Sequence, residues 1–521
     1  MSFLRRRKEP KPVKQLEQPT PDAPPTSETS LESTTFVETY PIFEPFVYVG
    51  ITQNPESGTM IYSVIEPVLI PKEQDLLKRV KELLKIALEV DVRTLEKTKS
   101  VDSYLKNKVL EILKRFDVKM PKSTFDKIMY YLNRDLLGYY IIDPLMKDPM
   151  IEDISCDGVK IPIYIWHREY ESIPTTLMFN SAEELDKFIL RMAYFSGKHV
   201  SVAEPLIDAA LPDGSRIQMT YGTEVTKKGS TFTIRKFKED PFSVVDLLRF
   251  GTLSSEMAAM VWLALENKSS ILLAGGTASG KTTTINCLSM FIRPEAKIVS
   301  IEDTPEINLA HKNWIQSISR TGVAGVGEVS LYDLLKAALR QRPDFIIVGE
   351  VRGAEASTLF QAISTGHAGL SSVHADSVQA VFNRLTSPPM SIPRMLVPSV
   401  NYILHQSRVT IAGKPTRRIM AMTEILGLDT RTNEFITNNV FQYDQPSDTF
   451  KYAGRSYIME KIAKANGYSV ERLNSELENR KIVLEWMLKK NIRKYTDVTD
   501  IVRRYYIDAD DLMNEIRIEA Y

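Results

Sequence analysis

Cysteine is scarce in this chain of 521 residues, where Cys156 and Cys287 are the only two and lie far apart. No C-x-x-C pair is present, so neither a cysteine zinc clip nor a disulfide framework is expected. Two thiols in so long a chain fit a reducing cytoplasm. Long apolar runs are also missing, since none approaches the roughly 20 residues that a membrane-spanning helix needs. The first eight residues carry charges with no apolar stretch behind them, unlike a secretory signal, so we expect a cytoplasmic protein.

An excess of charge of either sign is missing as well. Lys plus Arg and Asp plus Glu both number 66, which gives a net charge of zero. A protein that coats nucleic acid usually has a basic excess, so no nucleic-acid partner is expected, although a local basic groove is compatible with this balance. The composition, 43% hydrophobic and 25% charged, is typical of a soluble globular protein. The length suggests roughly three or four domains.

Residues 1–38 are rich in Pro, Glu, Ser and Thr and carry few large apolar side chains. Such a segment cannot offset its ordering entropy by burial, so we predict a disordered tail. Its start is basic, with Arg5, Arg6, Arg7, Lys8, Lys11 and Lys14. Two interpretations stay open: a solvated tail, or electrostatic attachment to an anionic membrane surface or an acidic partner.

Two modules are predicted between this tail and residue 240. In residues 39–138, short alternating runs predict strands, and apolar residues at helical spacing then predict a helical bundle that includes helices near 101–116 and 122–137. Residues 139–240 have a mixed α/β pattern, in which Leu211–Arg216 carries the residues of a hairpin turn.

Residues 241–521 alternate strands with helices. Pro241 favours the first turn of a linker helix, and apolar runs that predict buried strands follow at 271–274, 297–301, 345–348 and 370–373. This alternation predicts an α/β fold with a parallel-rich sheet and helices on its faces. From about residue 455 the pattern is almost wholly helical.

A phosphate-binding motif lies between the first of these strands and a helical segment. The motif G-x-x-x-x-G-K-[ST] is carried by Gly275, Gly276, Thr277, Ala278, Ser279, Gly280, Lys281 and Thr282, and Thr283 follows it. Its glycines permit a backbone path whose amides point at phosphate oxygens, and the helix adds its positive N-terminal end. Lys281 would reach the β- and γ-phosphates and the Thr282 hydroxyl would hold Mg²⁺. The predicted cofactors are therefore ATP and Mg²⁺.

Two carboxylates stand at the ends of later strands. Glu302 follows the run 297–301, and Glu350 follows the run 345–348 and Gly349. The ends of parallel strands on the side of the phosphate loop meet at the ligand crevice. Both carboxylates could therefore face the γ-phosphate, one polarising the attacking water and the other supporting Mg²⁺, which makes Glu350 a candidate metal ligand through water. A carboxylate after a strand is, by itself, often only a helix cap.

Two of the six histidines flank the strand at 370–373. A lone histidine is more often structural, and the sequence leaves His367 between a structural and a functional role. His374 stands at the strand end beside Ala375 and Asp376 and is the better candidate for sensing the γ-phosphate. No third ligand accompanies the two histidines, so they do not indicate a metal pair.

Taken together, these motifs resemble those of the secretion-type ring ATPases that drive type II secretion, type IV pili and the archaeal motility filament, the archaellum. Over roughly residues 140–430 the four boxes of that family occur in its order: a Walker A GGTASGKTT, an aspartate box SIEDTPE, a Walker B FIIVGEVRG and a histidine box TGHAGLSSVHAD. The resemblance implies a RecA-like P-loop domain preceded by a smaller mixed α/β domain and a helical module. The missing four-cysteine zinc site makes the chain more similar to the archaeal branch, and Ala278 stands where many members have Gly.

The family's domain ahead of the P-loop carries an LPDGSR turn and a TIRK strand, here with Arg216 and Arg235. The resemblance implies that these arginines reach the phosphates when that domain closes, across a subunit boundary. A guanidinium supplied from another body stabilises the charge that develops in phosphoryl transfer. Without the family context, an exposed hairpin arginine is usually only a solvated charge.

The resemblance further implies a cytoplasmic ATPase motor, peripheral at the cytoplasmic membrane, that forms a hexameric ring and moves a polytopic membrane protein of a filament or secretion machinery. Two alternatives stay open. A nucleic-acid translocase would show a basic groove and aromatic stacking platforms, which the zero net charge disfavours. A non-hydrolysing scaffold is disfavoured by Lys281, Thr282, Glu302 and Glu350.

Overall fold

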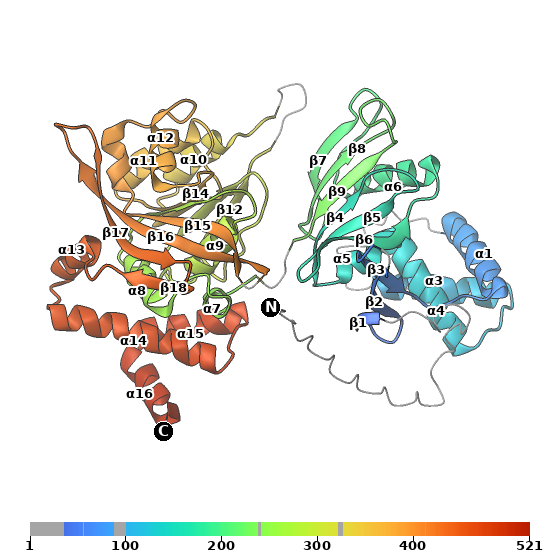
Figure 1. Ribbon diagram of the computed structural model, residues 1–521. Helices are drawn as coiled ribbons and strands as arrows, with labels where there is room; N and C mark the ends of the chain where they lie inside the picture. The colour runs from blue at the N-terminus through green and yellow to red at the C-terminus, as the bar shows by residue number, and fades with distance from the viewer. Residues whose placement is uncertain are drawn as a thin grey trace, which may run out of the picture. The chain divides into compact units, whose positions relative to one another are not determined.

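The computed structural model describes residues 36–55, 57–87, 101–237, 241–320, 327–411 and 413–520 (Figure 1). The chain forms two compact units, the first ending at Lys236 and the second beginning at Phe237. The larger part of the predicted basic tail, including its six basic residues, lies outside the described residues. The first strand begins at Phe36.

The first unit is built on a nine-stranded sheet in the order β1-β2-β3-β6-β5-β4-β9-β8-β7. Its alternating sequence gives alternating burial, as the pattern of β9 shows, and the apolar face packs under helix α6, Ala182–Phe195. The predicted hairpin is confirmed, since β7 and β8 flank the turn at Asp213 and Gly214. The strands are β1 Phe36–Phe43, β2 Val47–Gln53, β3 Met60–Ile65, β4 Ile151–Cys156, β5 Pro162–His167, β6 Glu171–Met178, β7 Leu206–Ala210, β8 Arg216–Thr220 and β9 Thr231–Arg235.

Three helices of the first unit, α1, α3 and α4, form a separate small core. Apolar residues recur on one stripe of each helix, as predicted, and Leu84, Val109 and Ile128 are buried where the stripes meet. The predicted helices near 101–116 and 122–137 are confirmed, the second continuing through one π turn. The helical segments are α1 Pro71–Ala87, α3 Val101–Arg115, α4 Lys122–Leu132, the π turn η1 Asn133–Leu137, η2 Tyr140–Ile142, α5 Asp143–Lys147 and α6 Ala182–Phe195.

Asp148 ties the ends of the first unit together. Its Oδ2 accepts hydrogen bonds from the hydroxyls of Tyr40 and Tyr62, at 2.7 and 2.6 Å, and so holds β1 and β3. Lys236, the last residue of the unit, donates from Nζ to the carbonyl of Leu145 at 3.1 Å and to that of Asp148. Burial lowers the pKa of Lys236 to about 8. The chain is therefore fixed up to the boundary between the units.

The second unit contains the predicted parallel-rich sheet, in the order β12-β11-β13-β14-β10-β15-β16-β17-β18. Pairing is parallel from β12 to β15 and antiparallel from there to β18. The predicted α/β class with a RecA-like P-loop sheet is confirmed. The strands are β10 Ile271–Ala274, β11 Ile298–Glu302, β12 Trp314–Ile318, β13 Phe345–Val348, β14 Ala368–Val373, β15 Tyr402–Ile411, β16 Lys414–Leu428, β17 Phe435–Asp444 and β18 Thr449–Tyr452.

Helices cover both faces of this sheet (Figure 1). Alternate residues of β10 divide between two cores: Ile271 and Leu273 pack with α8 and the C-terminal helices, whereas Leu272 and Ala274 pack with α10, α11 and α12. The linker helix begins at Val244 after a Ser243 cap, three residues later than Pro241 suggests. The helices here are α7 Val244–Arg249, α8 Ser255–Glu266, α9 Lys281–Ser289, α10 Leu331–Leu339, α11 Glu355–Ser364, α12 Val378–Thr386 and the 3₁₀ segment η3 Arg394–Ser399.

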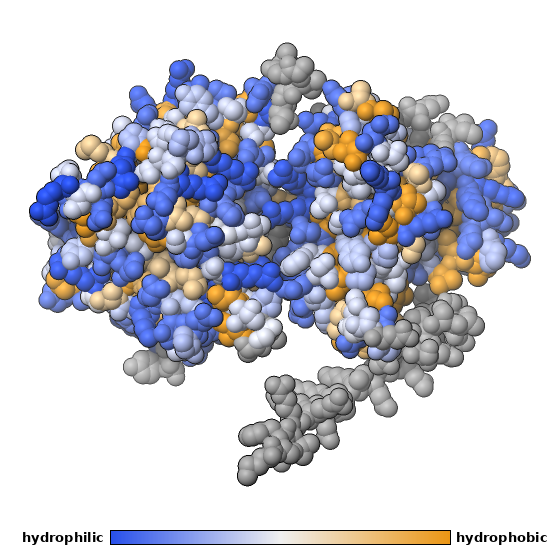
Figure 2. All heavy atoms as spheres, turned by 45° about the horizontal axis from the view of Figure 1, so that its top comes forward, coloured by the Kyte–Doolittle hydropathy of each residue, from blue (hydrophilic) through white to orange (hydrophobic). Residues whose placement is uncertain are grey.

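Four further helices end the chain, α13 Tyr457–Asn466, α14 Val470–Lys489, α15 Tyr495–Ile507 and α16 Ala509–Ala520. Arg480 of α14 is only 3% exposed and donates to Glu266 of α8, while its guanidinium lies over the ring of Tyr505. None of the helices in the described ranges is long and apolar enough to span a bilayer. On the face drawn in Figure 2, apolar atoms lie in separate patches among polar ones.

Candidate nucleotide site

The phosphate loop runs from β10 into α9, and Gly275 fixes its first turn. A Cβ at Gly275 would lie 2.2 Å from the carbonyl oxygen of Gln406 and 2.6 Å from Ser279 Oγ, so only glycine fits there. Gly280 caps α9 with a φ of +90°, a conformation that side chains rarely adopt. Ser279 Oγ donates to the carbonyl of Gly276 at 2.9 Å and closes the turn. The fold therefore uses both framing glycines.

Lys281 lies over the loop at the first turn of α9. Its Nζ donates to the carbonyls of Gly275 and Gly276, both at 2.9 Å. Burial lowers the pKa of Lys281, while the negative charge of Glu350 opposes that shift. Thr282 is half-buried and Thr283 is exposed on the same turn. This arrangement places a cation, a hydroxyl and the positive end of a helix together, which is the chemistry that polyphosphate requires.

Glu302 ends β11 and is 3% exposed. Its Oε1 accepts from the backbone amides of Glu306 and Ile307, both at 2.9 Å, and its Oε2 accepts one longer bond of 3.3 Å from Gln316 Nε2. Burial raises the pKa of Glu302 to about 7, although these hydrogen bonds oppose the shift. One oxygen thus anchors the turn after β11, and the other is only weakly held.

Glu350 follows the neighbouring strand, β13, after one intervening residue, Gly349. A Cβ at Gly349 would lie 3.5 Å from Cγ of Glu302, so the two strand ends are adjacent. Glu350 Oε2 accepts from Nε and Nη2 of Arg352, at 3.0 and 2.6 Å, and this pairing raises the pKa of Arg352. The buried Glu355 fixes the turn by accepting from the amides of Arg352 and Gly353.

The two histidines lie at opposite ends of β14. His374 is half-buried after the strand, and its Nε2 is 3.1 Å from Thr277 Oγ1 of the phosphate loop. His367 precedes the strand, and its Nδ1 is 3.2 Å from the carbonyl of Ala362. Asp376 Oδ1 would lie 3.5 Å from a Cβ at Gly276. The histidine box therefore reaches the loop through His374, whereas His367 packs at the far end of its strand.

Arg216 and Arg235 lie on the first unit and are directly opposite each other in the pairing of β8 with β9. Both are exposed. Arg216 Nε donates to Asp208 Oδ1 at 3.3 Å, and Arg235 is opposite Asp153 of β4. Like charges directly opposite each other destabilise a sheet unless something else balances them. The structure therefore pairs the two arginines in one cationic spot, each beside a carboxylate.

Three residues near the phosphate loop escaped the sequence analysis. Gln406 of β15 is 1% exposed, and its side-chain Nε2 would be 3.1 Å from a Cβ at Gly280. No sequence signal marks it, because it follows the P-loop by more than a hundred residues and belongs to no motif. Arg352 and Glu355 shape the turn at Glu350; Arg352 lies inside the Walker B box and Glu355 two residues beyond it, and that position was the one signal available.

The residues present suit a nucleotide with Mg²⁺. No group of three or more His, Cys, Asp or Glu side chains that could hold a metal by themselves occurs within the described ranges. Mg²⁺ bound with phosphates keeps several waters and takes only one or two protein ligands. Thr282 and Glu350 are candidates for this role.

Comparison with known proteins matches the family described as Type II/IV secretion system protein over residues 139–499. The protein MJ0900 of Methanocaldococcus jannaschii is 38% identical over 489 residues, covering 90% of this chain and 88% of that protein. The type IV secretion system protein VirB11 of Bartonella henselae is 30% identical over 244 residues, covering 40% and 68% of the two chains.

Among solved structures, the Legionella pneumophila ATPase DotB is 18% identical with a TM-score of 0.40, covering 57% of this chain and 82% of DotB. The pilus retraction motor PilT with bound ADP is 18% identical with a TM-score of 0.39, covering 67% and 92%. The family match spans more than half of the chain, and the relative in M. jannaschii spans most of it. The chain belongs to the type II/IV secretion system protein family.

Proposed function

We propose that this protein is an ATP-hydrolysing motor that works as a homo-oligomeric, six-membered ring at the cytoplasmic face of a membrane. It powers assembly or rotation of an archaeal type IV pilus-like filament, or a type II-like secretion system. One observation carries the proposal: the phosphate loop, Glu302, Glu350 and His374 stand at the same end of one parallel sheet. Family membership supports it.

Glu302 and Glu350 have different roles in the proposed hydrolysis. Glu302, with a pKa of about 7 and one weakly held oxygen, suits the acceptance of a proton from the attacking water. Glu350 is more accessible and, with the Thr282 hydroxyl, supports Mg²⁺. Lys281 neutralises phosphate charge, and His374 reports an occupied site to β14 through Thr277. When bound, Mg²⁺ supplies charge stabilisation for the transferring phosphoryl group.

The adjacent arginines give the motor its dependence on geometry. We assign Arg216 and Arg235 to the phosphates of a neighbouring subunit, where a guanidinium stabilises the developing charge. Hydrolysis then needs the first unit of one subunit to close on the second unit of another. Hydrolysis drives this motion because the closed and open arrangements of the two units differ in their affinities for ATP and for ADP. A polytopic membrane protein is the proposed load, and the basic tail offers contact with anionic lipid.

Steady-state ATP hydrolysis tests the proposal. The full chain is assayed against protein concentration, alone, with anionic vesicles and with single- and double-stranded DNA. A specific activity that rises with concentration and with vesicles, and ignores DNA, is expected for a ring motor at a membrane. Activity that is flat in concentration and raised several-fold by DNA would contradict the proposal and favour a nucleic-acid translocase.

Variants test the assigned roles within the same assay. Glu350→Gln should lower kcat by about a hundredfold or more, the loss usual for a group acting in the transition state. Arg216→Ala and Arg235→Ala should each lower kcat while nucleotide binding by a single subunit stays unchanged. Arg168→Ala is the matched control, because it removes an arginine from the turn between β5 and β6 of the same unit. If the Glu350 and arginine variants were as active as the Arg168→Ala control, the assigned roles would be refuted.

A further inference from the structure

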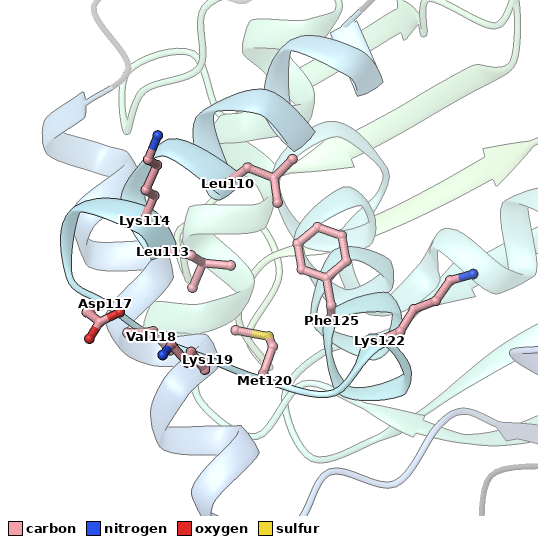
Figure 3. A pocket seen from close by; sticks show the side chains of 9 residues that line it. All are labelled: Leu110, Leu113, Lys114, Asp117, Val118, Lys119, Met120, Lys122 and Phe125. Carbon is pink, nitrogen blue, oxygen red and sulfur yellow. The ribbon is translucent and has the colours of Figure 1, made fainter.

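A hollow of about 530 Å³ opens between α3 and α4, far in the sequence from the residues of the nucleotide site. Its floor is apolar: Leu110 and Leu113 of α3, Met120 of the connecting turn and Phe125 of α4 point toward one another in Figure 3. Leu113 is 7% exposed, but Leu110 remains 46% exposed. A partner that covers this surface would remove apolar area from water, which favours association.

Local chain geometry holds this hollow open. Helix α3 ends at Arg115, and Asp117 turns the chain with a φ of +48°. The amide of Val118 then donates back to the carbonyl of Leu113 at 2.9 Å. Pro121, with extended backbone angles, is the residue directly before α4, and Val118, Lys119 and Met120 of the connection line the hollow. The hollow is therefore formed by the connection between α3 and α4 together with the two helix ends.

The rim of the hollow is cationic. Lys114, Lys119 and Lys122 border it, and the amines of Lys114 and Lys122 point away from the floor in Figure 3. Within the described part of the chain, none of the three lysines forms an ion pair, and Asp117 is the one acidic residue of the lining. Residues 101–127 contain seven basic and four acidic residues, a net charge of +3. An occupant therefore has to combine apolar side chains with carboxylates.

We propose that this hollow, here called the α3–α4 groove, binds an acidic amphipathic helix of a partner protein. An apolar floor between two helices with charges along its rim fits a helix that inserts side chains at i, i+3, i+4 and i+7. A second copy of the same module is disfavoured, because two cationic rims would meet. A lipid surface is disfavoured, because the apolar side chains line a concavity. The proposal does not depend on ATP hydrolysis, since no nucleotide-site residue lines the groove.

A peptide selection tests this inference. Random 16-residue peptides displayed on phage are selected on the full chain and counter-selected on the triple variant Lys114→Glu/Lys119→Glu/Lys122→Glu. The matched control, Lys198→Glu/Lys227→Glu/Lys228→Glu, makes the same charge change at exposed positions of the same unit. We expect enriched sequences with apolar residues at helical spacing flanked by Asp and Glu.

Affinities of the best synthetic peptide then separate the groove from general charge. Fluorescence anisotropy should show at least tenfold weaker binding to the groove variant, near-native binding to the control, and at least threefold weaker binding to Leu110→Ser. Leu110 is already partly exposed, so this variant should fold, and thermal unfolding of all variants is compared with that of the parent. Three results would overturn the proposal: no peptide that distinguishes the groove variant, binding of phosphatidylglycerol vesicles lost in that variant without any peptide ligand, or self-association lost in it.

Discussion

Gly275 and Gly276 are adjacent glycines of one loop with opposite tolerance for a methyl group. At Gly275 the added Cβ would lie 2.2 Å from the backbone oxygen of Gln406, closer by about 1 Å than carbon and oxygen approach each other, so β10 and β15 have to shift apart. At Gly276 the nearest atom is Asp376 Oδ1 at 3.5 Å, an ordinary contact. Neither glycine has a positive φ, so the comparison isolates packing.

The expected cost follows from that overlap. Overpacking a well-filled interior usually costs about 1–3 kcal/mol, and a clash with backbone belongs at the upper end. Gly275→Ala should therefore lower the free energy of unfolding of the second unit by about 3 kcal/mol, and Gly276→Ala by less than about 0.5 kcal/mol. At about 2 °C for each kcal/mol in a unit of this size, the midpoint should fall by about 6 °C in Gly275→Ala.

Thermal unfolding followed by tryptophan fluorescence measures this difference without nucleotide. Three of the four tryptophans, Trp262, Trp314 and Trp486, belong to the second unit and report on it. Equal midpoints for the two variants would refute the reasoning that the carbonyl of Gln406 sets the path of the loop. A lower unfolding midpoint in Gly276→Ala alone would show that the tight contact lies at Gly276 and not at Gly275.

Two further predictions concern buried charge. Burial raises the pKa of Glu302 from 4.5 to about 7, so its contribution to stability is full below pH 4.5 and is lost as pH rises through 7. Glu302→Gln should remove that loss of stability, on the order of 3 kcal/mol. The unfolding midpoint of the variant, relative to that of the parent, should therefore rise as pH increases from 5 to 8. A difference between the two midpoints that stays constant with pH would contradict this prediction. Arg480 and Arg293 both pair with Glu266, but they are 3% and 57% exposed. Arg480→Leu should cost about 3–5 kcal/mol in urea unfolding and Arg293→Leu under 1 kcal/mol, whereas similar costs would show that burial does not decide the value of this pair.

The local parts of the nucleotide site were predictable from the sequence. An apolar strand, a glycine-framed loop and a lysine at fixed spacing define the P-loop, and carboxylates after apolar strands must meet at one sheet end in a parallel fold. The predicted site residues of the second unit do gather there. Their individual roles stay predictions, as do those of the arginines.

Long-range pairing was not predictable. Strands β1–β3 join the sheet of the first unit through the parallel pair of Tyr62 with Thr175, more than a hundred residues apart, and periodicity carries no information about such partners. The approach of Gln406 to the loop depends on the register of β15 against β10. The ion pair of Arg352 with Glu350 depends on a turn that Glu355 fixes. Each is a matter of register or turn geometry that residue type alone leaves open.

The hydrogen bonds of Lys236 limit the length of the chain segment that joins the two units. Lys236 is held on Leu145 and Asp148, and on the other side the carbonyl of Phe242 accepts from Cys287 Sγ at 3.0 Å. Six Cα–Cα steps join the two anchored residues, at most about 22 Å when fully extended. A tether this short keeps the effective concentration of the first unit near its own second unit in the millimolar range. Under the proposed mechanism, in which a neighbouring subunit supplies Arg216 and Arg235, we expect a change in the length of this connection to alter kcat before it alters the affinity for ATP.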